Sequence, residues 1–527
     1  MTVLAKRRSE KIIIAALAAI TSLAAVLRLP LFSTVVAGLR TGKIVWFDEA
    51  YSIFFAGHGL ADVIRFTGYD SSPGLFAVLL HFWRSLAGTG VTAMAVLPFA
   101  FSLAAVPLLY LAGREFFGRR AGFVAAALTA AAPLAIKYAT EIRTYSLLFC
   151  LAVLSLTYLK RLLDRGRRRD AVLWAVFSAL GLYAHYTFVV FFALENAFVL
   201  ASVLRREFRR AGLWLLAAAG TAASCLPLLF IFKRWGDLAD GPVGSFFSRG
   251  FGHGDLLSFA SYFSSLGFGE ARFYMAGWLS ASWSLALGAL VFATLAASAW
   301  AGRRDCGVQL AAFMAFGGVV ALMAAGIIYD PRYFLPYLAP AVLLAASGLA
   351  RLRGRRALLA AATLLVLLVL PVSEAWTVTP ALSFKYYAPY FAAEIEDREE
   401  PGDLLLLDHA TDILFRLYYS GRADEAVFFP KDGRNVTDMF ERFRWFDYNL
   451  ATPADEATLA ELTAGRRRVW TVDYYPQRTS LADPGGLKRR WFSRNFVLED
   501  AVEFPPGGED GQKVLLLLYV RPSSPSQ

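Results

Sequence analysis

Long apolar runs separated by short basic clusters dominate the first three quarters of the chain. A helix needs about 20 apolar residues to cross a bilayer, because backbone groups surrounded by lipid must bond within their own segment. Eleven runs fit this pattern and predict membrane-spanning helices: 12–29, 94–113, 121–138, 145–162, 171–187, 189–204, 212–232, 281–301, 308–328, 333–350 and 357–376. We expect the first run to be an uncleaved membrane helix rather than a secretory signal.

A twelfth apolar stretch, Gly74–Leu86, is short and contains His81 and Arg84. Its status follows from the positive-inside rule. The basic clusters are Lys6 to Arg8, Arg114 to Arg120, Lys160 to Arg169, Arg205 to Arg210, Arg303-Arg304 and Arg351 to Arg356. With the N-terminus inside and eleven spans, every cluster is cytoplasmic. We therefore predict that Gly74–Leu86 lies along the outer surface or enters and returns.

The same topology places two large segments on the outer side, the first loop 30–93 and the tail 377–527. The tail is much richer in charged residues than the rest. Strand-like runs at 404–407, 468–472 and 513–520 alternate with a helical pattern at 411–419. Short strands alternating with helices indicate a small extracytoplasmic α/β domain.

Composition agrees with a polytopic membrane protein. Apolar residues make up 57% of the 527 positions and charged residues 18%, whereas soluble domains carry about 25% charged residues. The formal charge of +11 would suggest nucleic acid in a soluble protein. Here the arginines mark topology, so we expect no nucleic-acid partner.

The first outer loop carries Trp46-Phe47-Asp48-Glu49-Ala50-Tyr51. Acids near a membrane boundary are costly unless hydrated or paired, which favours a functional interpretation. The same residues fit a helix start, with Asp48 as N-cap and Glu49 in the first turn. The two interpretations are compatible.

Three further outer segments carry polar side chains. Tyr69-Asp70-Ser71-Ser72-Pro73 fits an ordinary turn. Glu141 and Arg143, in a turn before Tyr145, fit either a site or a local ion pair. Arg332, before Tyr333, fits a phosphate ligand or a side chain reaching toward the membrane surface. His185-Tyr186 and His253 are further candidates, although a lone histidine is more often structural.

Taken together and in this order, these motifs resemble the GT-C membrane glycosyltransferases. The acidic pair after the first helix, the Asp-x-x-Pro stretch ending in His81-Phe82-Trp83, the Glu-x-Arg-x-Tyr turn and the motif Asp330 to Pro336 carry the resemblance. The chain is most similar to the bacterial branch related to protein O-mannosyltransferases and the lipid A aminoarabinose transferase. The resemblance covers about 1–376, which we take as the catalytic domain, with 377–527 as a separate domain.

The resemblance implies transfer of a sugar from a polyprenyl-phosphate donor to a protein, lipid or envelope glycan, in the inner (plasma) membrane. It implies Asp48 as the base. We assign Asp48, Glu49 and Glu141 to catalysis, and Arg143 and Arg332 to the donor phosphate. Substrate-binding candidates are Tyr51, Tyr69, Asp70, Tyr145, His185, Tyr186, His253 and Tyr333. Relatives place an acid or lysine where Ser72 stands here, so a divalent metal is possible but no ligand set follows.

Two other functional classes remain as alternatives. A transporter or flippase of lipid-linked intermediates typically has related halves and charged residues at mid-span. The sequence suggests neither, since its acids gather at one face. A non-catalytic scaffold leaves the placement of Asp48 and Glu49 unexplained.

Overall fold

The structure is a computed structural model of the 527-residue chain. It describes residues 3–32, 34–36, 39–41, 43–67, 72–205, 208, 210–229, 277–324, 331–355, 387–428, 453–475, 486–504 and 513–522. The predicted span 357–376 and the candidate residues Tyr69, Asp70 and His253 lie outside the described residues.

The chain forms two compact units. The membrane unit contains Met1–Phe32 and Val63–Thr377, and the α/β unit contains Ser33–Asp62 and Val378–Gln527. The sequence led us to expect the whole first loop, 30–93, in the membrane unit. In the structure the first half of that loop associates with the C-terminal segment instead.

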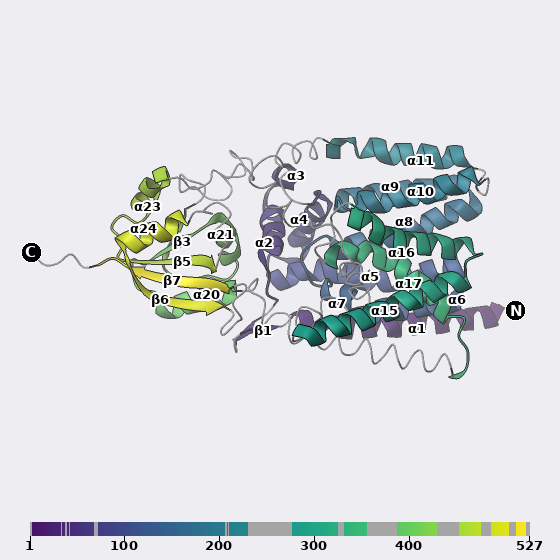
Figure 1. The fold of residues 1–527 in the computed structure, drawn as a ribbon, viewed down its shortest axis with the longest axis horizontal. Helices are drawn as coiled ribbons and strands as arrows, with labels where there is room; N and C mark the ends of the chain where they lie inside the picture. The colour runs from purple at the N-terminus through teal and green to yellow at the C-terminus, as the bar shows by residue number, and fades with distance from the viewer. Residues whose placement is uncertain are drawn as a thin grey trace, which may run out of the picture. The chain divides into compact units, whose positions relative to one another are not determined.

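The membrane unit is a bundle of helices (Figure 1). The helices are α1 (Val3–Arg28), α4 (Leu75–Ala87), α5 (Val91–Phe117), α6 (Arg119–Ala131), α7 (Pro133–Lys137), α8 (Tyr145–Arg165), α9 (Arg168–Ala184), α10 (Phe188–Leu204), α11 (Ala211–Ser224), α15 (Gly277–Ala301), α16 (Cys306–Ala324) and α17 (Leu335–Leu349). Short 3-10 helices follow α1 (Leu29–Phe32) and precede α17 (Pro331–Phe334), and α3 (Leu60–Thr67) runs from one unit into the other. The predicted spans within the described residues are therefore helical, although Pro133 divides the third into α6 and α7.

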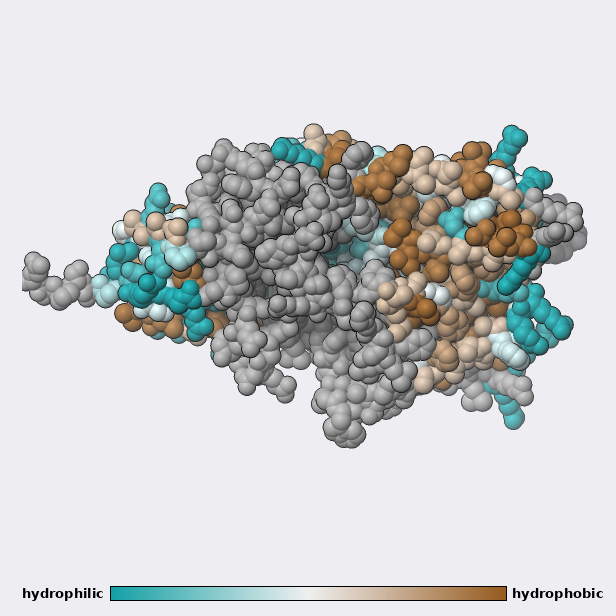
Figure 2. All heavy atoms as spheres, turned by 45° about the horizontal axis from the view of Figure 1, so that its top comes forward, coloured by the Kyte–Doolittle hydropathy of each residue, from teal (hydrophilic) through white to brown (hydrophobic). Residues whose placement is uncertain are grey.

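Helix α17 lies at the centre of the bundle and packs against α5, α6, α8, α15 and α16. Helices α5 and α6 pack closely because Gly113 faces Gly122. A Cβ atom on Gly113 would lie only 2.9 Å from the Gly122 Cα. Small residues permit such close approach in membrane bundles, where van der Waals packing holds helices together. Figure 2 shows hydrophobic residues across the visible described face of the helices, as contact with lipid requires.

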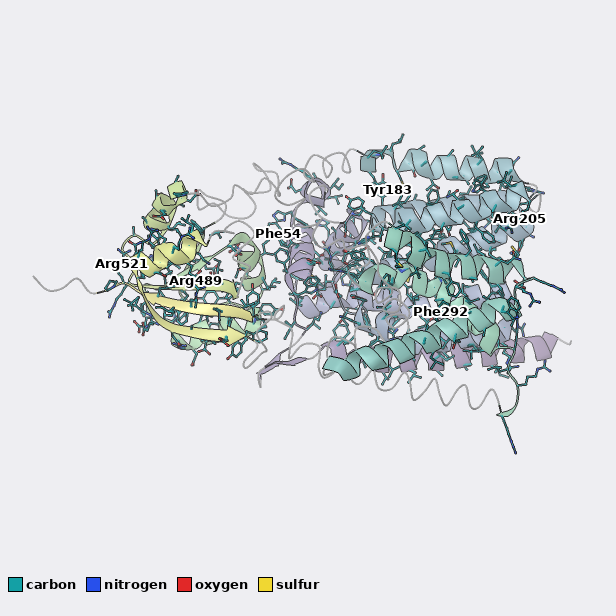
Figure 3. The ribbon with its side chains drawn as sticks, in the orientation of Figure 1. Phe54, Tyr183, Arg205, Phe292, Arg489 and Arg521 are labelled. Atoms are coloured by element: carbon teal, nitrogen blue, oxygen red, sulfur yellow. The ribbon has the colours of Figure 1, made fainter. Side chains whose placement is uncertain are left out.

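The basic turns gather at one end of the bundle. Arg120, in the α5–α6 turn, donates from Nη2 to the carbonyl of Leu352 at 2.7 Å. Arg210, before α11, donates to the carbonyl of Gly166 in the α8–α9 turn at 2.7 Å. In Figure 3, Arg205 lies toward this end and Tyr183, near the end of α9, lies away from it. The grouping of these clusters on one side agrees with the positive-inside prediction.

The bundle geometry also agrees with the prediction that Gly74–Leu86 does not cross the membrane. Arg28, at the end of α1, bonds to the carbonyl of Ala130, near the end of α6. Helices α1 and α6 therefore run in the same direction, and α5 runs in the opposite one. The chain leaves α1 and enters α5 at the same end, so α4 and its neighbours do not carry it through the bundle (Figure 1).

One acid lies inside the bundle, contrary to our expectation that the acids gather at one face. Glu195, in α10, is fully buried. Its carboxylate accepts hydrogen bonds from Ser155 Oγ at 2.8 Å and Trp174 Nε1 at 3.0 Å, from α8 and α9. These neutral donors satisfy the group locally, which is the form expected of a buried polar contact that joins three helices.

The α/β unit is built on a five-stranded sheet of order β4-β3-β5-β7-β6. Its strands are β3 (Leu404–Leu407), β4 (Asp424–Val427), β5 (Arg468–Tyr475), β6 (Val497–Phe504) and β7 (Lys513–Val520). Strands β4, β3 and β5 are parallel, and β7 pairs antiparallel with β5 and β6. The helices are α2 (Phe47–Ala56), α20 (Ala388–Arg398), α21 (His409–Phe415), α23 (Glu456–Leu462) and α24 (Leu487–Asn495), with a 3-10 turn at Pro453–Asp455 and a hairpin of β1 (Thr34–Val36) and β2 (Leu39–Thr41).

The three predicted strands are confirmed, and β3 and β7 have the predicted bounds. The predicted helix 411–419 is α21, which ends four residues earlier. The core on one face of the sheet includes Leu406, Val469, Trp491, Phe492 and Tyr519. Strands β4 and β6 were not predicted.

Replacing Arg28 tests the packing of α1. The guanidinium is fully buried and donates to Ser102 Oγ at 2.9 Å as well as to Ala130. We expect Arg28→Leu to destabilise the protein by about 1–3 kcal/mol, because buried acceptors lose their donors. Thermal unfolding in detergent measures this, with exposed Arg205→Leu as the control. Equal melting temperatures for the two variants would contradict the assignment.

Candidate functional site

The acidic pair of the first loop occupies the first turn of α2, in the α/β unit. The helix begins at Phe47, so Asp48 and Glu49 are its second and third residues. Glu49 is fully buried, and its carboxylate accepts a hydrogen bond from the Trp46 N–H at 3.2 Å. Lys43 Nζ lies 3.0 Å from the same carboxylate. Glu49 therefore closes the helix start as the acid of a capping box does, and its charge is compensated.

Asp48 has different surroundings. Its side chain is half-buried rather than fully buried, and its backbone carbonyl accepts from Ser52 Oγ at 3.2 Å. The sequence left open that Asp48 is the N-cap; in the structure the N-cap is Trp46. Asp48 lies in the first turn, where the helix dipole favours a carboxylate. Of the two acids, Asp48 is therefore the more exposed.

A second group of candidate residues comes together in the membrane unit, from three segments distant in sequence. We call Arg143, Tyr145, His185, Arg332 and Tyr333 the arginine–histidine cluster. The ring centre of His185 lies 5.9 Å from that of Tyr145 and 5.5 Å from that of Tyr333. Arg332 donates from Nη1 to the Tyr145 hydroxyl at 3.3 Å, and its guanidinium carbon lies 5.5 Å from the centre of the Tyr333 ring.

Arg143 is almost completely buried, with 3% of its surface exposed. Its Nη2 donates to Ser72 Oγ at 3.4 Å, and its backbone N–H donates to the Glu141 carbonyl at 2.7 Å. A buried guanidinium brings a positive charge and a planar set of N–H donors to its surroundings. Such a group is suited to an anionic ligand, particularly a phosphate that two guanidinium N–H groups can grip.

The arginine–histidine cluster lies at the end of the bundle opposite the basic turns. Tyr145 begins α8, whose other end is Arg165. His185 follows α9, whose first residue is Arg168. Arg332 precedes α17, after which come the arginines of 351–355. The positive charges of this cluster are therefore distinct from those that mark topology.

His185 is held as a neutral imidazole of defined tautomer. Burial, followed by the charges of Arg143 and Arg332, lowers its pKa to about 3. Its Nδ1 accepts from the Thr187 backbone N–H at 3.1 Å and contacts Thr187 Oγ1 at 2.8 Å. A backbone N–H can only donate, so the proton of the neutral ring is on Nε2. None of the described contacts involves the Nε2–H group. His185 therefore presents a neutral N–H donor near Arg143 and Arg332.

The remaining candidate residues differ in burial and in the elements that carry them. Glu141 is half-buried in the turn before α8, and Tyr186 is half-buried beside His185. Tyr51 is buried in α2, with its ring centre 4.6 Å from that of Phe47. Sequence reasoning missed Thr187 and gave Ser72 no role. The two-residue spacing of Thr187 from His185 was the available signal. Among the described residues, no group of three or more His, Cys, Asp or Glu side chains is arranged to hold a metal ion.

Comparison with known proteins places this geometry in context. Residues 71–231 match a family model described as dolichyl-phosphate-mannose-protein mannosyltransferase. No curated protein sequence matches the chain. ArnT from Cupriavidus metallidurans, solved bound to undecaprenyl phosphate, is similar in structure with a TM-score of 0.59 and 13% identity, over 95% of this chain and 97% of that one.

The archaeal oligosaccharyltransferase AglB from Archaeoglobus fulgidus, in complex with an inhibitory peptide and a dolichol-phosphate, has a TM-score of 0.54 at 14% identity, over 88% of this chain and 69% of that one. The chain has a GT-C fold. The resemblance inferred from the sequence motifs is thereby confirmed.

The state of His185 can be measured directly. We expect ¹⁵N spectra of histidine-labelled protein to show the Nε2–H tautomer for His185, unchanged from about pH 8 to about pH 5, because its pKa is lowered far below that of a free histidine. The His185→Gln variant assigns the signal by its disappearance. A shift to the doubly protonated form above pH 5 would show that burial and the two arginine charges do not lower the pKa of this ring.

Proposed function

We propose that the chain is an inverting glycosyltransferase, which moves a sugar from a polyprenyl-phosphate donor to an acceptor on the outer face of the membrane. The acceptor class is a protein, a lipid or a cell-envelope glycan. The proposal includes a cytoplasmic N-terminus and an extracytoplasmic α/β unit in the inner (plasma) membrane, as the basic turns suggest.

The observation that carries the proposal is the arginine–histidine cluster. Arg143 and Arg332 supply two guanidiniums at one end of the bundle, and both lower the pKa of the same histidine. His185 adds an N–H donor without adding charge. Such a set fits a phosphate monoester or diester, because guanidiniums hold its oxygens and a neutral donor adds a directed hydrogen bond.

A lipid-linked phosphate is the ligand class that fits this location best. The cluster lies where membrane helices end, so a donor whose chain stays in the bilayer can present its head group there. The ArnT structure was solved with undecaprenyl phosphate and the AglB structure with a dolichol-phosphate. These similar folds support a polyprenyl-phosphate ligand here.

The proposed reaction breaks one bond and forms another at the anomeric carbon of the sugar. The acceptor oxygen or nitrogen attacks from the face opposite the phosphate, and its proton passes to Asp48. The bond to the phosphate oxygen breaks, and its electron pair stays on the polyprenyl phosphate. Arg143, Arg332 and His185 stabilise the charge that develops there. Tyr145 and Tyr333, whose rings lie beside His185 and Arg332, are the proposed sugar-binding residues, and Glu141 is the second candidate acid.

Asp48 is the preferred base because Glu49 is committed elsewhere. The Glu49 carboxylate is fully buried and bonded to Lys43 and the Trp46 N–H. Both carboxylate oxygens are therefore occupied by donors of the helix start. Asp48 is half-buried in the same turn, so its carboxylate can meet an acceptor.

The pair Asp48→Asn and Glu49→Gln tests this division of roles. We expect Asp48→Asn to lower single-turnover transfer by about 10²–10⁴-fold, because a general base is lost. Its melting temperature should change little, since a carboxylate in the first turn of a helix typically contributes only about 0.3–1 kcal/mol. Glu49→Gln should mainly lower the melting temperature, because the ion pair to Lys43 is lost. The donor is chosen from undecaprenyl-phosphate mannose, glucose, galactose and arabinose, with envelope membranes as acceptor.

Transfer by Asp48→Asn within about threefold of the parent would exclude Asp48 as the base. Glu141 would then become the first candidate.

Replacing Arg143 by Lys tests the phosphate site independently of catalysis. The positive charge remains but the planar fork is lost, so we expect the Kd for undecaprenyl phosphate to rise by about tenfold. Arg205→Lys, at the opposite end of the bundle, is the matched control and should bind as the parent does. Equal affinity of the two variants would place the phosphate elsewhere.

A further inference from the structure

We propose that Tyr418 is a positioning residue for the reaction, and that through it the C-terminal segment fixes the turn carrying Asp48. The inference rests on the proposed function in one respect, the role of Asp48. It assigns the C-terminal segment a part in catalysis, although the segment itself contains none of the candidate catalytic acids.

The first observation is the composition of the α/β unit. Residues Ser33–Asp62 group with Val378–Gln527 in one compact unit, although more than 300 residues separate the two segments. Within this unit α2 packs against α21. The helix that bears Asp48 is therefore supported by an element of the C-terminal segment.

The second observation is a hydrogen bond between the two segments. The Val45 N–H donates to the Tyr418 hydroxyl at 2.7 Å. Val45 is fully buried and immediately precedes Trp46, the N-cap of α2. Because a buried backbone N–H without an acceptor is costly, this bond fixes the chain where it enters the helix.

The third observation is that the neighbouring N–H is also held by a side chain. Trp46 donates to Glu49, which belongs to the helix itself. Two successive backbone donors are thus bound, one by a local carboxylate and one by Tyr418. Together they determine the direction in which the first turn of α2 starts, and Asp48 is part of that turn.

Tyr418 is suited to this task because it stays a phenol. Burial, followed by the charge of Glu49, raises its pKa. An unionised hydroxyl accepts the Val45 N–H without placing a second negative charge beside Glu49. Tyr418 and Glu49 accept from the successive N–H groups of Val45 and Trp46, so the two side chains meet at the same stretch of backbone.

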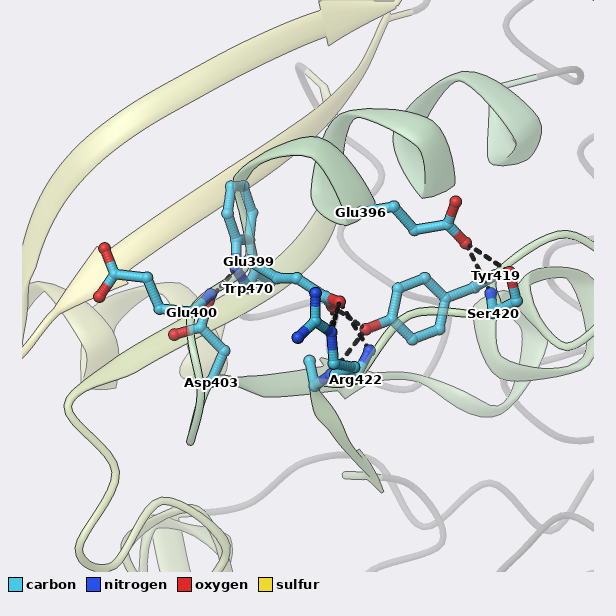
Figure 4. A network of polar contacts seen from close by, with 9 residues as sticks. Glu396, Glu399, Glu400, Asp403, Tyr419, Ser420, Arg422 and Trp470 are labelled. Carbon is cyan, nitrogen blue, oxygen red and sulfur yellow. Dashed lines mark hydrogen bonds and ion pairs between the residues drawn. The ribbon is translucent and has the colours of Figure 1, made fainter.

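The adjacent tyrosine provides a matched comparison. Tyr419 donates from its hydroxyl to Glu399 at 2.5 Å and accepts from the Ala423 N–H at 2.9 Å. Figure 4 shows this network, in which Glu399 also faces Arg422. Its described hydrogen bonds all join parts of the C-terminal segment. Tyr418 and Tyr419 thus offer the same chemical change, loss of one hydroxyl, with different consequences.

The experiment compares Tyr418→Phe with Tyr419→Phe in the full-length protein. Steady-state transfer uses the undecaprenyl-phosphate sugar that the parent accepts and envelope membranes. We expect Tyr418→Phe to lower kcat by about tenfold with the donor KM unchanged, because displacement of a catalytic group by less than an ångström is costly. Tyr419→Phe should keep kcat within about twofold, although it loses two hydrogen bonds.

Hydrogen exchange provides a readout that is independent of activity. In Tyr418→Phe the backbone amides of 44–49 should exchange faster, because the start of α2 opens more often. In Tyr419→Phe they should exchange as in the parent. The inference is supported if faster exchange and lower kcat occur together in Tyr418→Phe alone.

Two results would overturn it. Exchange at 44–49 that is equal in the two variants would show that Tyr418 does not hold the segment. Faster exchange with unchanged kcat would show that the held segment is not catalytic. An active Asp48→Asn in the same series would instead locate the failure in the proposed base, since the exchange data do not depend on it.

Discussion

A polar group inside a bilayer must find its partners within the protein, and the membrane unit is organised around that constraint. Arg28 ends α1 with its guanidinium bonded to Ser102 and Ala130, so three helices share one buried charge. Glu195 joins α8, α9 and α10 in the same way through Ser155 and Trp174. The other arginines that the structure describes in the bundle lie at or near the ends of its helices.

The two ends then differ in what the arginines do. At one end they bond to backbone carbonyls of neighbouring turns, as Arg120 and Arg210 do. At the other end Arg143 and Arg332 meet hydroxyls, aromatic rings and a neutral histidine. A phosphate on a lipid is the anion that reaches the end of a membrane helix without leaving the bilayer, which links this constraint to the proposed donor.

Sequence patterns predicted the helices well because lipid imposes a long and uniform apolar signal. They also predicted β3 and β7, which are continuous apolar runs buried in the sheet. Strands β4 and β6 were not predicted because both are edge strands. Edge strands carry charged, exposed residues such as Glu499, which interrupt the apolar pattern. The buried contact made by Glu195 was not predicted because a single acid in an apolar run gives no periodic signal.

The candidate residues were predictable as a set, but their division of labour was not. The motifs named Arg143, His185 and Arg332, and the structure brings them together. Roles that depend on partners distant in sequence can be assigned only from the three-dimensional structure. The bond from Val45 to Tyr418 spans 373 positions, and no local pattern indicates it. The same holds for the burial that separates Glu49 from Asp48.

The central claim is that this protein consumes a polyprenyl monophosphate sugar, and the lipids of cells that lack it test this most directly. Mass spectrometry of lipid extracts should show one polyprenyl monophosphate sugar accumulating after deletion, with recovery on expression of the parent protein but not of Asp48→Asn. Accumulation of a pyrophosphate-linked oligosaccharide on the cytoplasmic leaflet would indicate a flippase instead. An unchanged lipid profile would contradict the account.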